Sequence, residues 1–157
     1  MKHRPRPPEQ DDLLRPRLVD MIDMRHELVK LAGLIDWDVF ERQWGGFFPS
    51  TTGRPATPPR LVAGLLYLQH AFALSDGAVV ARWVENPYFQ HFTGETFFQH
   101  VPPIDPSSLT RWRKRIGEEG VEWLLTQTIE AGRRCGALKP DSFERVAVDT
   151  TVMEKAI

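Results

Sequence analysis

The stretch Asp105-Pro-Ser-Ser-Leu-Thr-Arg-Trp-Arg-Lys-Arg-Ile116 organises the rest of this sequence. Asp105 and Pro106 are typical of a helix N-cap and first helical position, because proline lacks the N–H that a helix start leaves unpaired. Large apolar residues then follow at helical spacing and share one side of the helix. These residues are Leu109, Trp112 and Ile116. We therefore expect a helix that is anchored to a core by one apolar stripe.

The opposite side of this helix carries hydroxyl groups and cations. Residues 106–117 contain four basic residues and no acidic one. Hydroxyl, Lys and Arg side chains bind DNA phosphates, and arginine can read guanine with two hydrogen bonds. The candidate DNA contacts are Ser107, Ser108, Thr110, Arg111, Arg113, Lys114 and Arg115. An ordinary solvated helix face has the same composition, so this stretch alone leaves both interpretations open.

The charge of the whole chain does not by itself favour a nucleic-acid partner. The 157 residues carry a net charge of −1, with a pI of about 6.5, and their composition is ordinary for a soluble globular domain. The charge is unevenly placed, however. Residues 61–105 contain one arginine and four acidic residues, whereas residues 106–117 contain four basic residues. Binding to a polyanion must therefore be local.

Cysteine usage and hydropathy indicate a cytoplasmic protein. Cys135 is the only cysteine, which excludes an intrachain disulfide and fits a reducing compartment. No apolar run follows the basic N-terminal residues, so we expect no secretory signal. The most apolar window, residues 61–74, is too short to cross a bilayer. We expect no membrane partner.

The remaining pattern predicts a mainly α-helical region. Residues 1–16 are proline-rich and polar, and we expect them to be disordered. Apolar spacing predicts one or two short helices within residues 17–35 and an aromatic turn at residues 88–94. Further helices are predicted at residues 36–44, 59–73, 76–85 and 121–134. Residues 59–73 are apolar nearly all round, so this helix should be central, with Leu65 in the core.

Two of these helices, residues 59–73 and 76–85, have the arrangement of a helix-turn-helix unit, because only a tight turn separates them. The second helix exposes Arg82, but its other exposed residues are neutral or acidic. A packing scaffold is therefore favoured over a DNA reader for this pair. Before it, residues 47–59 form a linker in which Arg54 could enter a minor groove, with Arg60 a further candidate contact. A plain linker is the commoner role for such a segment.

Reaction chemistry is plausible at one place, Asp149. Residues 143–148 change to a β-like alternation, and a carboxylate at a strand end is held rigidly, as a Mg²⁺ ligand must be. One carboxylate does not complete such a site, because two-metal phosphoryl transfer needs several. An Asp–Thr turn after an edge strand is the plainer interpretation from the residues alone.

Several motifs in one order resemble a known family. They are Arg25-His-Glu-Leu-Val-Lys-Leu-Ala with Ile35-Asp-Trp, Gly53-Arg-Pro, Leu65-Leu-Tyr-Leu with Leu74-Ser-Asp, Arg82-Trp-Val-Glu-Asn-Pro-Tyr-Phe-Gln90, Phe98-Gln-His100, Asp105 to Gly117, and Val148-Asp-Thr-Thr-Val152. Together they resemble the N-terminal part of bacterial insertion-sequence transposases of the DDE type, within the insertion-sequence-five family.

The resemblance implies a helix-turn-helix-like, helical DNA-binding domain over residues 17–138. Residues 139–157 would then begin an RNase H-like catalytic domain whose first β-strand delivers Asp149 as a catalytic residue and Mg²⁺ ligand. The implied partner is double-stranded DNA, namely the terminal repeats of the element, with a homodimer possible. The sequence continues for only eight residues after Asp149, whereas a domain of this kind needs about 100–150 residues.

We therefore expect a truncated product that binds Mg²⁺ weakly and is inactive alone. Two other functions stay open. One is a stand-alone helical repressor that occupies the element ends, and the other is an interaction module that dimerises through its aromatic helices and does not bind DNA.

Overall fold

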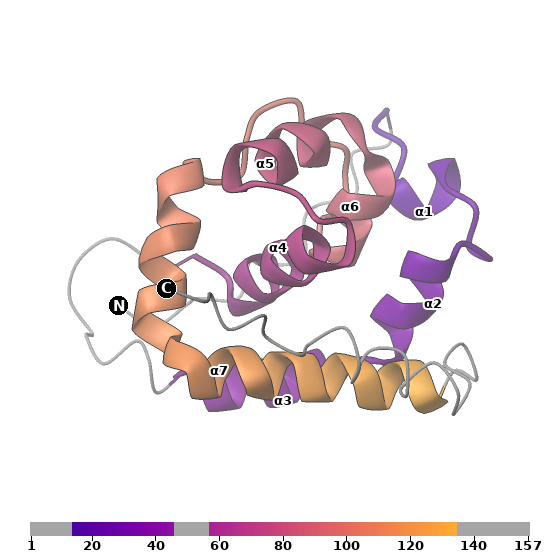
Figure 1. The fold of residues 1–157 in the computed structure, drawn as a ribbon. Coiled ribbons are helices and arrows are strands. Elements are labelled where there is room, and N and C mark those ends of the chain that lie inside the picture. Colours follow the sequence, from indigo (N-terminus) through magenta and orange to yellow (C-terminus); the bar gives the residue numbers. More distant parts are fainter. Residues whose placement is uncertain (1–13, 46–56, 135–157) are drawn as a thin grey trace.

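A computed structural model describes residues 14–45 and 57–134 of the chain, and seven helices lie within them (Figure 1). They are α1 (Leu18–Met21), α2 (Glu27–Leu34), α3 (Trp37–Trp44), α4 (Pro59–Ala71), α5 (Asp76–Glu85), α6 (Pro87–Phe92) and α7 (Pro106–Arg134). The extended pairing within the described residues is an isolated bridge between Arg17 and Phe97. The predicted mainly helical region is therefore confirmed.

Local capping explains where several helices begin. The Asp36 side chain accepts a hydrogen bond from the Val39 N–H at 3.1 Å, and Ser75 Oγ accepts one from the Ala78 N–H at 3.2 Å. Each cap satisfies a backbone donor that the first turn of a helix leaves unpaired. The predicted helices at residues 36–44 and 76–85 are confirmed to within one residue.

The predicted aromatic turn at residues 88–94 is wrong, because this segment contains the short helix α6. Asn86 Oδ1 accepts hydrogen bonds from the N–H groups of Tyr88 at 2.9 Å and Phe89 at 3.3 Å. Pro87 then occupies the first helical position, where its missing N–H costs nothing. The Asn86-Pro87 pair therefore ends one helix and begins the next.

Helix α4 lies at the centre of the fold and contacts α3, α5 and α7 (Figure 1). Leu65 and Leu68 are fully buried, as predicted for an apolar helix. A Cβ added to Gly64 would lie 2.8 Å from Thr93 Cγ2, so glycine allows the close approach of α6. The predicted helix at residues 59–73 ends earlier, at Ala71, and Phe72 just after it is 40% exposed.

The segment between α6 and α7 is held against α6 by Gln90, which is fully buried. Gln90 Oε1 accepts a hydrogen bond from the Gln99 N–H at 2.7 Å, and Gln90 Nε2 donates to Gln99 O at 2.9 Å and Trp83 O at 3.1 Å. Burying the Gln90 side-chain amide without hydrogen-bond partners would cost free energy. These bonds therefore hold the segment around Gln99 in one position against α6. That segment leads into the start of α7.

A sharp kink at Gly117 divides α7 into two halves (Figure 1). Gly117 has φ 66° and ψ −177°, a conformation that only glycine adopts readily. The kink lies between the basic helix that begins at Asp105 and the helix predicted at residues 121–134. In the second half, Trp123 packs edge-on against Phe40 of α3, with ring centroids 4.6 Å apart. The kink thus lets the two halves of α7 cover different sides of the core.

Some of the sequence-based expectations lie outside the described residues. These concern the Pro-rich residues 1–13, Arg54 in the linker, and the β-like segment that ends at Asp149. Within the described ranges, none of the helices combines the length and the apolar character needed to cross a membrane.

Candidate nucleic-acid interface

The first half of α7 buries its apolar stripe and exposes its basic side. Leu109 and Ile116 are buried against the core, and Trp112 is 8% exposed. Five of the predicted DNA-contact residues are exposed, namely Ser107, Thr110, Arg111, Lys114 and Arg115, while Ser108 and Arg113 are half-buried. We use "outer face of α7" for Ser107, Ser108, Arg111, Lys114 and Arg115.

The outer face begins with a short chain of hydrogen bonds. Asp105 Oδ1 accepts from the Ser107 N–H at 2.9 Å and from Ser107 Oγ at 2.6 Å. The side-chain bond from Ser107, followed by its backbone bond, lowers the pKa of the Asp105 carboxyl below its usual value. Ser107 Oγ in turn accepts from Arg111 Nη2 at 3.2 Å. The helix start therefore orients Arg111 along the surface.

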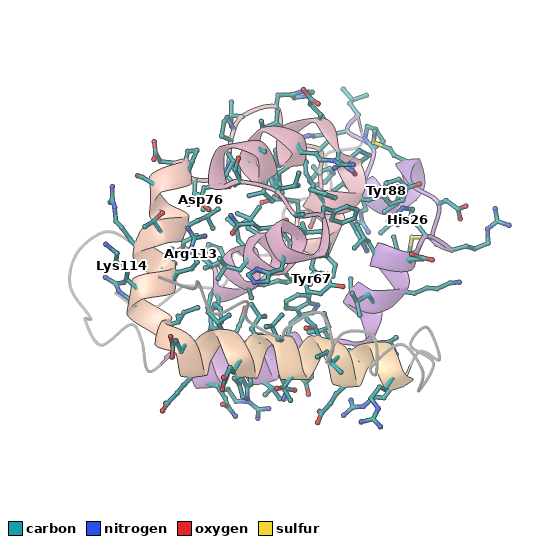
Figure 2. The ribbon with its side chains drawn as sticks, viewed as in Figure 1. His26, Tyr67, Asp76, Tyr88, Arg113 and Lys114 are labelled. Atoms are coloured by element: carbon teal, nitrogen blue, oxygen red, sulfur yellow. The ribbon has the colours of Figure 1, made fainter. Side chains whose placement is uncertain are left out.

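Lys114 and Arg115 complete the cations of this face. Lys114 lies on the outer side of α7 and points away from the body of the protein (Figure 2). The Arg115 guanidinium lies over the Trp112 ring, 5.2 Å from its centroid. That cation–π contact orients Arg115 while its charge stays accessible. Arg111 and Lys114 are three positions apart and so lie on the same side of the helix.

Arg113 lies on the inner side of the same helix and faces Asp76, the first residue of α5 (Figure 2). Arg113 Nη1 donates to Asp76 Oδ1 at 2.8 Å, and Arg113 Nη2 donates to Asp76 Oδ2 at 2.7 Å. The Arg113 hydrogen bonds hold the pKa of the Asp76 carboxyl well below its usual range, and the same bonds raise the pKa of Arg113.

Two further side chains join this ion pair. Thr110 Oγ1 donates to Asp76 Oδ2 at 2.9 Å, and Gln69 Oε1, near the end of α4, accepts from Arg113 Nη1 at 2.9 Å. Gln69 Nε2 also donates to Asp76 Oδ1. Sequence reasoning missed Gln69 and Asp76, because partners 34 to 44 residues away give no periodic signal.

The side chain of Arg60, a predicted DNA contact, forms hydrogen bonds and a cation–π contact within the protein. Its Nε donates to Phe92 O and its Nη2 donates to His91 O, each at 3.2 Å. Its guanidinium also lies 4.6 Å from the centroid of the Trp37 ring. Burial lowers the pKa of Arg60 to about 10. These contacts tie α4 to α3 and to the end of α6, whose terminal carbonyls need donors.

Arg54 and Asp149, the other predicted functional residues, lie outside the described residues. Across residues 14–45 and 57–134, no group of three or more His, Cys, Asp or Glu side chains could hold a metal ion. Of the predicted functional residues that the structure describes, those of the basic helix lie together on α7.

Comparison with known proteins identifies related sequences. A family model described as a transposase domain (DUF772) matches residues 16–115, which contain α1 to α6 and end within the basic half of α7. A Rhizobium meliloti protein, named "Uncharacterized protein ORF8 in nfe locus", is 53% identical over 148 residues. The alignment covers 94% of this chain and 71% of that protein. No solved structure matches.

Proposed function

Because this chain belongs to the family of transposase domains (DUF772), we propose that it serves DNA transposition by binding double-stranded DNA with the outer face of α7. The target in this proposal is the terminal inverted repeats of an insertion sequence. That choice rests on the resemblance of the motifs to DDE-type transposases of the insertion-sequence-five family. A homodimer would let one assembly hold both ends of an element.

The observation that supports DNA binding most directly is the exposed pair Arg111 and Lys114 on a rigid helix. Both are exposed, and residues 106–117 contain no acidic residue that would repel phosphates. The apolar stripe and the bonds to Asp76 hold the other sides of this helix, so its outer face has a fixed position. Fixed cations and hydroxyls on a helix are the groups that position proteins on DNA.

The catalytic part of the proposal concerns Asp149. In a DDE transposase with an RNase H-like catalytic domain, a carboxylate at this position would hold Mg²⁺ together with other carboxylates. A divalent ion of this kind would supply charge stabilisation during phosphoryl transfer. The described residues contain no metal-ligand cluster to complement Asp149. No reaction step is therefore assigned to the helical region, whose role in the proposal is to bind DNA.

A gel mobility-shift assay tests the proposal, with labelled terminal-repeat DNA and an unrelated duplex of equal length. Wild type should shift the repeat at lower protein concentration than the unrelated duplex. Lys114→Glu should abolish the shift, because it places a carboxylate on the outer face of α7. Lys30→Glu makes the same charge change at an exposed position of α2 and should leave binding intact.

Two results would contradict the proposal. If wild type shifted neither duplex, the chain would not be a DNA-binding protein, and the interaction-module alternative would be supported. If both lysine variants lost binding equally, the attraction would come from total charge rather than from the outer face of α7.

A further inference from the structure

The Asp76 carboxylate accepts hydrogen bonds from side chains of two other helices. Its two carboxylate oxygens accept from Arg113 and Thr110 of α7 and from Gln69 of α4. Asp76 itself is the first residue of α5, so this one carboxylate joins three helices. The side chains of Asp76 and Arg113 are 23% and 33% exposed, which screens them only partly from water.

The bonding leaves Arg113 few donors for another ligand. A guanidinium has five N–H groups, four of them on its two terminal nitrogens. Arg113 Nη1 donates to Asp76 at 2.8 Å and to Gln69 Oε1 at 2.9 Å. Arg113 Nη2 donates to Asp76 at 2.7 Å and to Thr110 Oγ1 at 3.2 Å. All four terminal N–H groups are therefore used within the protein.

Arg113 thus differs from the other cations of the basic helix. Lys114 points outward from α7, whereas Arg113 points toward Asp76 (Figure 2). The Asp76 carboxylate accepts two hydrogen bonds directly from Arg113, whereas Asp105, whose charge attracts Arg111, accepts its hydrogen bonds from Ser107. The helix has four basic residues in its sequence but presents three of them on its outer face.

We propose that Asp76 is a specificity-determining residue for DNA: it withholds Arg113 from phosphates and fixes the position of α7 on α4 and α5. This inference rests on the proposed function. Each phosphate contact adds attraction to any DNA sequence, so an extra free arginine would strengthen non-specific binding. Base recognition instead needs a helix in one defined position. Asp76 would therefore improve the ratio of specific to non-specific binding.

The dependence of DNA affinity on salt measures the number of phosphate contacts. Three contacts predict a slope of log K against log salt of about −2.7, from roughly −0.9 per contact. Arg113→Gln should leave this slope unchanged, whereas Lys114→Gln should flatten it by about 0.9. Asp76→Asn should release Arg113 and steepen the slope to about −3.6. The Asp76→Asn/Arg113→Gln double variant should return to about −2.7.

Asp105→Asn is the matched control for Asp76→Asn. It removes one negative charge beside the same helix, and asparagine still caps a helix well. Asp105 accepts its hydrogen bonds from the N–H and Oγ of Ser107 rather than from Arg113, so the slope of this variant should stay at the wild-type value. Asp76→Asn should also bind an unrelated duplex more tightly relative to the terminal repeat, and Asp105→Asn should keep the wild-type ratio.

Three outcomes would overturn the inference while leaving the proposed function intact. In the first, Arg113→Gln flattens the slope as Lys114→Gln does, which means that Arg113 already contacts phosphate. In the second, a folded Asp76→Asn protein keeps the wild-type slope, so the pair only stabilises the fold. In the third, Asp105→Asn steepens the slope equally, which indicates a general charge effect.

Circular dichroism shows which variants fold. If Asp76→Asn does not fold, the comparison of Arg113→Gln with Lys114→Gln still decides whether Arg113 is withheld from phosphate. If wild type binds no DNA, the proposed function itself fails, and this inference fails with it.

Discussion

Replacing Gly117 with alanine should destabilise the protein, and the effect should come from the backbone conformation rather than from side-chain packing. A Cβ added at Gly117 would meet no atom within 4 Å, so the substitution creates no clash. The cost comes from the backbone, because φ 66° with ψ −177° is a region that other residues rarely enter. Holding a residue there costs about 1–3 kcal/mol. We expect the free energy of unfolding to fall by about that amount.

The chain offers a matched control in Gly33 of α2, where an added Cβ also meets nothing within 4 Å. Gly33 lies in a helix and has no positive φ. Alanine there should be neutral or should stabilise the protein by roughly 0.5–1 kcal/mol. Urea unfolding followed by tryptophan fluorescence compares the two variants. Equal stabilities of Gly117→Ala and Gly33→Ala would refute the argument that the kink requires glycine.

The kink at Gly117 also lies between two cations of the outer face and two glutamates, because Glu118 and Glu119 follow Lys114 and Arg115 by four positions each. If alanine straightened α7, each glutamate would share a helix face with its cation. Pairs at that spacing attract each other on a helix surface. DNA binding by Gly117→Ala should therefore weaken as well. Unchanged DNA affinity with lowered stability would show that the kink serves packing alone.

The other predictions concern the core, the ion pair and Asp149. Leu65→Ala and Trp112→Ala should each lower the free energy of unfolding by about 2–5 kcal/mol through lost burial and the cavity left behind; a loss under about 1 kcal/mol in denaturant titrations would contradict the assigned helix faces. The lowered pKa of Asp76 means that its contribution is present above its ordinary pKa of 3.8 and is lost as pH falls below that value toward the folded pKa. Asp76→Asn should therefore lose less stability than wild type in acid titrations over this range, and equal acid sensitivity would refute the linkage. If Asp149 holds a catalytic Mg²⁺, Asp149→Asn should leave binding of terminal-repeat DNA unchanged and should abolish any cleavage that depends on Mg²⁺ or Mn²⁺, because asparagine lacks the charge that balances the ion; cleavage that survives Asp149→Asn would show that other residues carry the reaction.

Helix caps and glycines predicted much of the fold from the sequence, because the residues that form each of these features lie close together in the chain. Asp36 and Ser75 cap helices through bonds that span three residues, so the sequence displays both partners together. Gly117 marks the kink because glycine adopts its backbone conformation readily. Helix α6 was not predicted, because Asn86 both ends α5 and caps α6, and the sequence alone does not show that one residue takes both roles.

The candidate site was harder to predict, because its geometry depends on contacts between distant segments. Thr110 and Arg113 belong to the basic helix by sequence, yet they bond to Asp76, 34 and 37 residues away. Arg60 was a further candidate DNA contact. The sequence did not show that its donors bond to carbonyls of α6, which lie 31 and 32 residues further along the chain. Charge and spacing identified the basic helix but not which of its cations are free.

The central claim is that the outer face of α7 binds DNA phosphates, and one salt titration tests it most directly. Wild type should bind terminal-repeat DNA with a slope of about −2.7, and Arg111→Gln/Lys114→Gln should flatten it to about −0.9, because two phosphate contacts are lost. Lys30→Gln/Arg42→Gln removes the same charge from exposed positions of α2 and α3 and should keep the wild-type slope. An unchanged slope in the Arg111/Lys114 variant, or an equal change in the control, would contradict the claim.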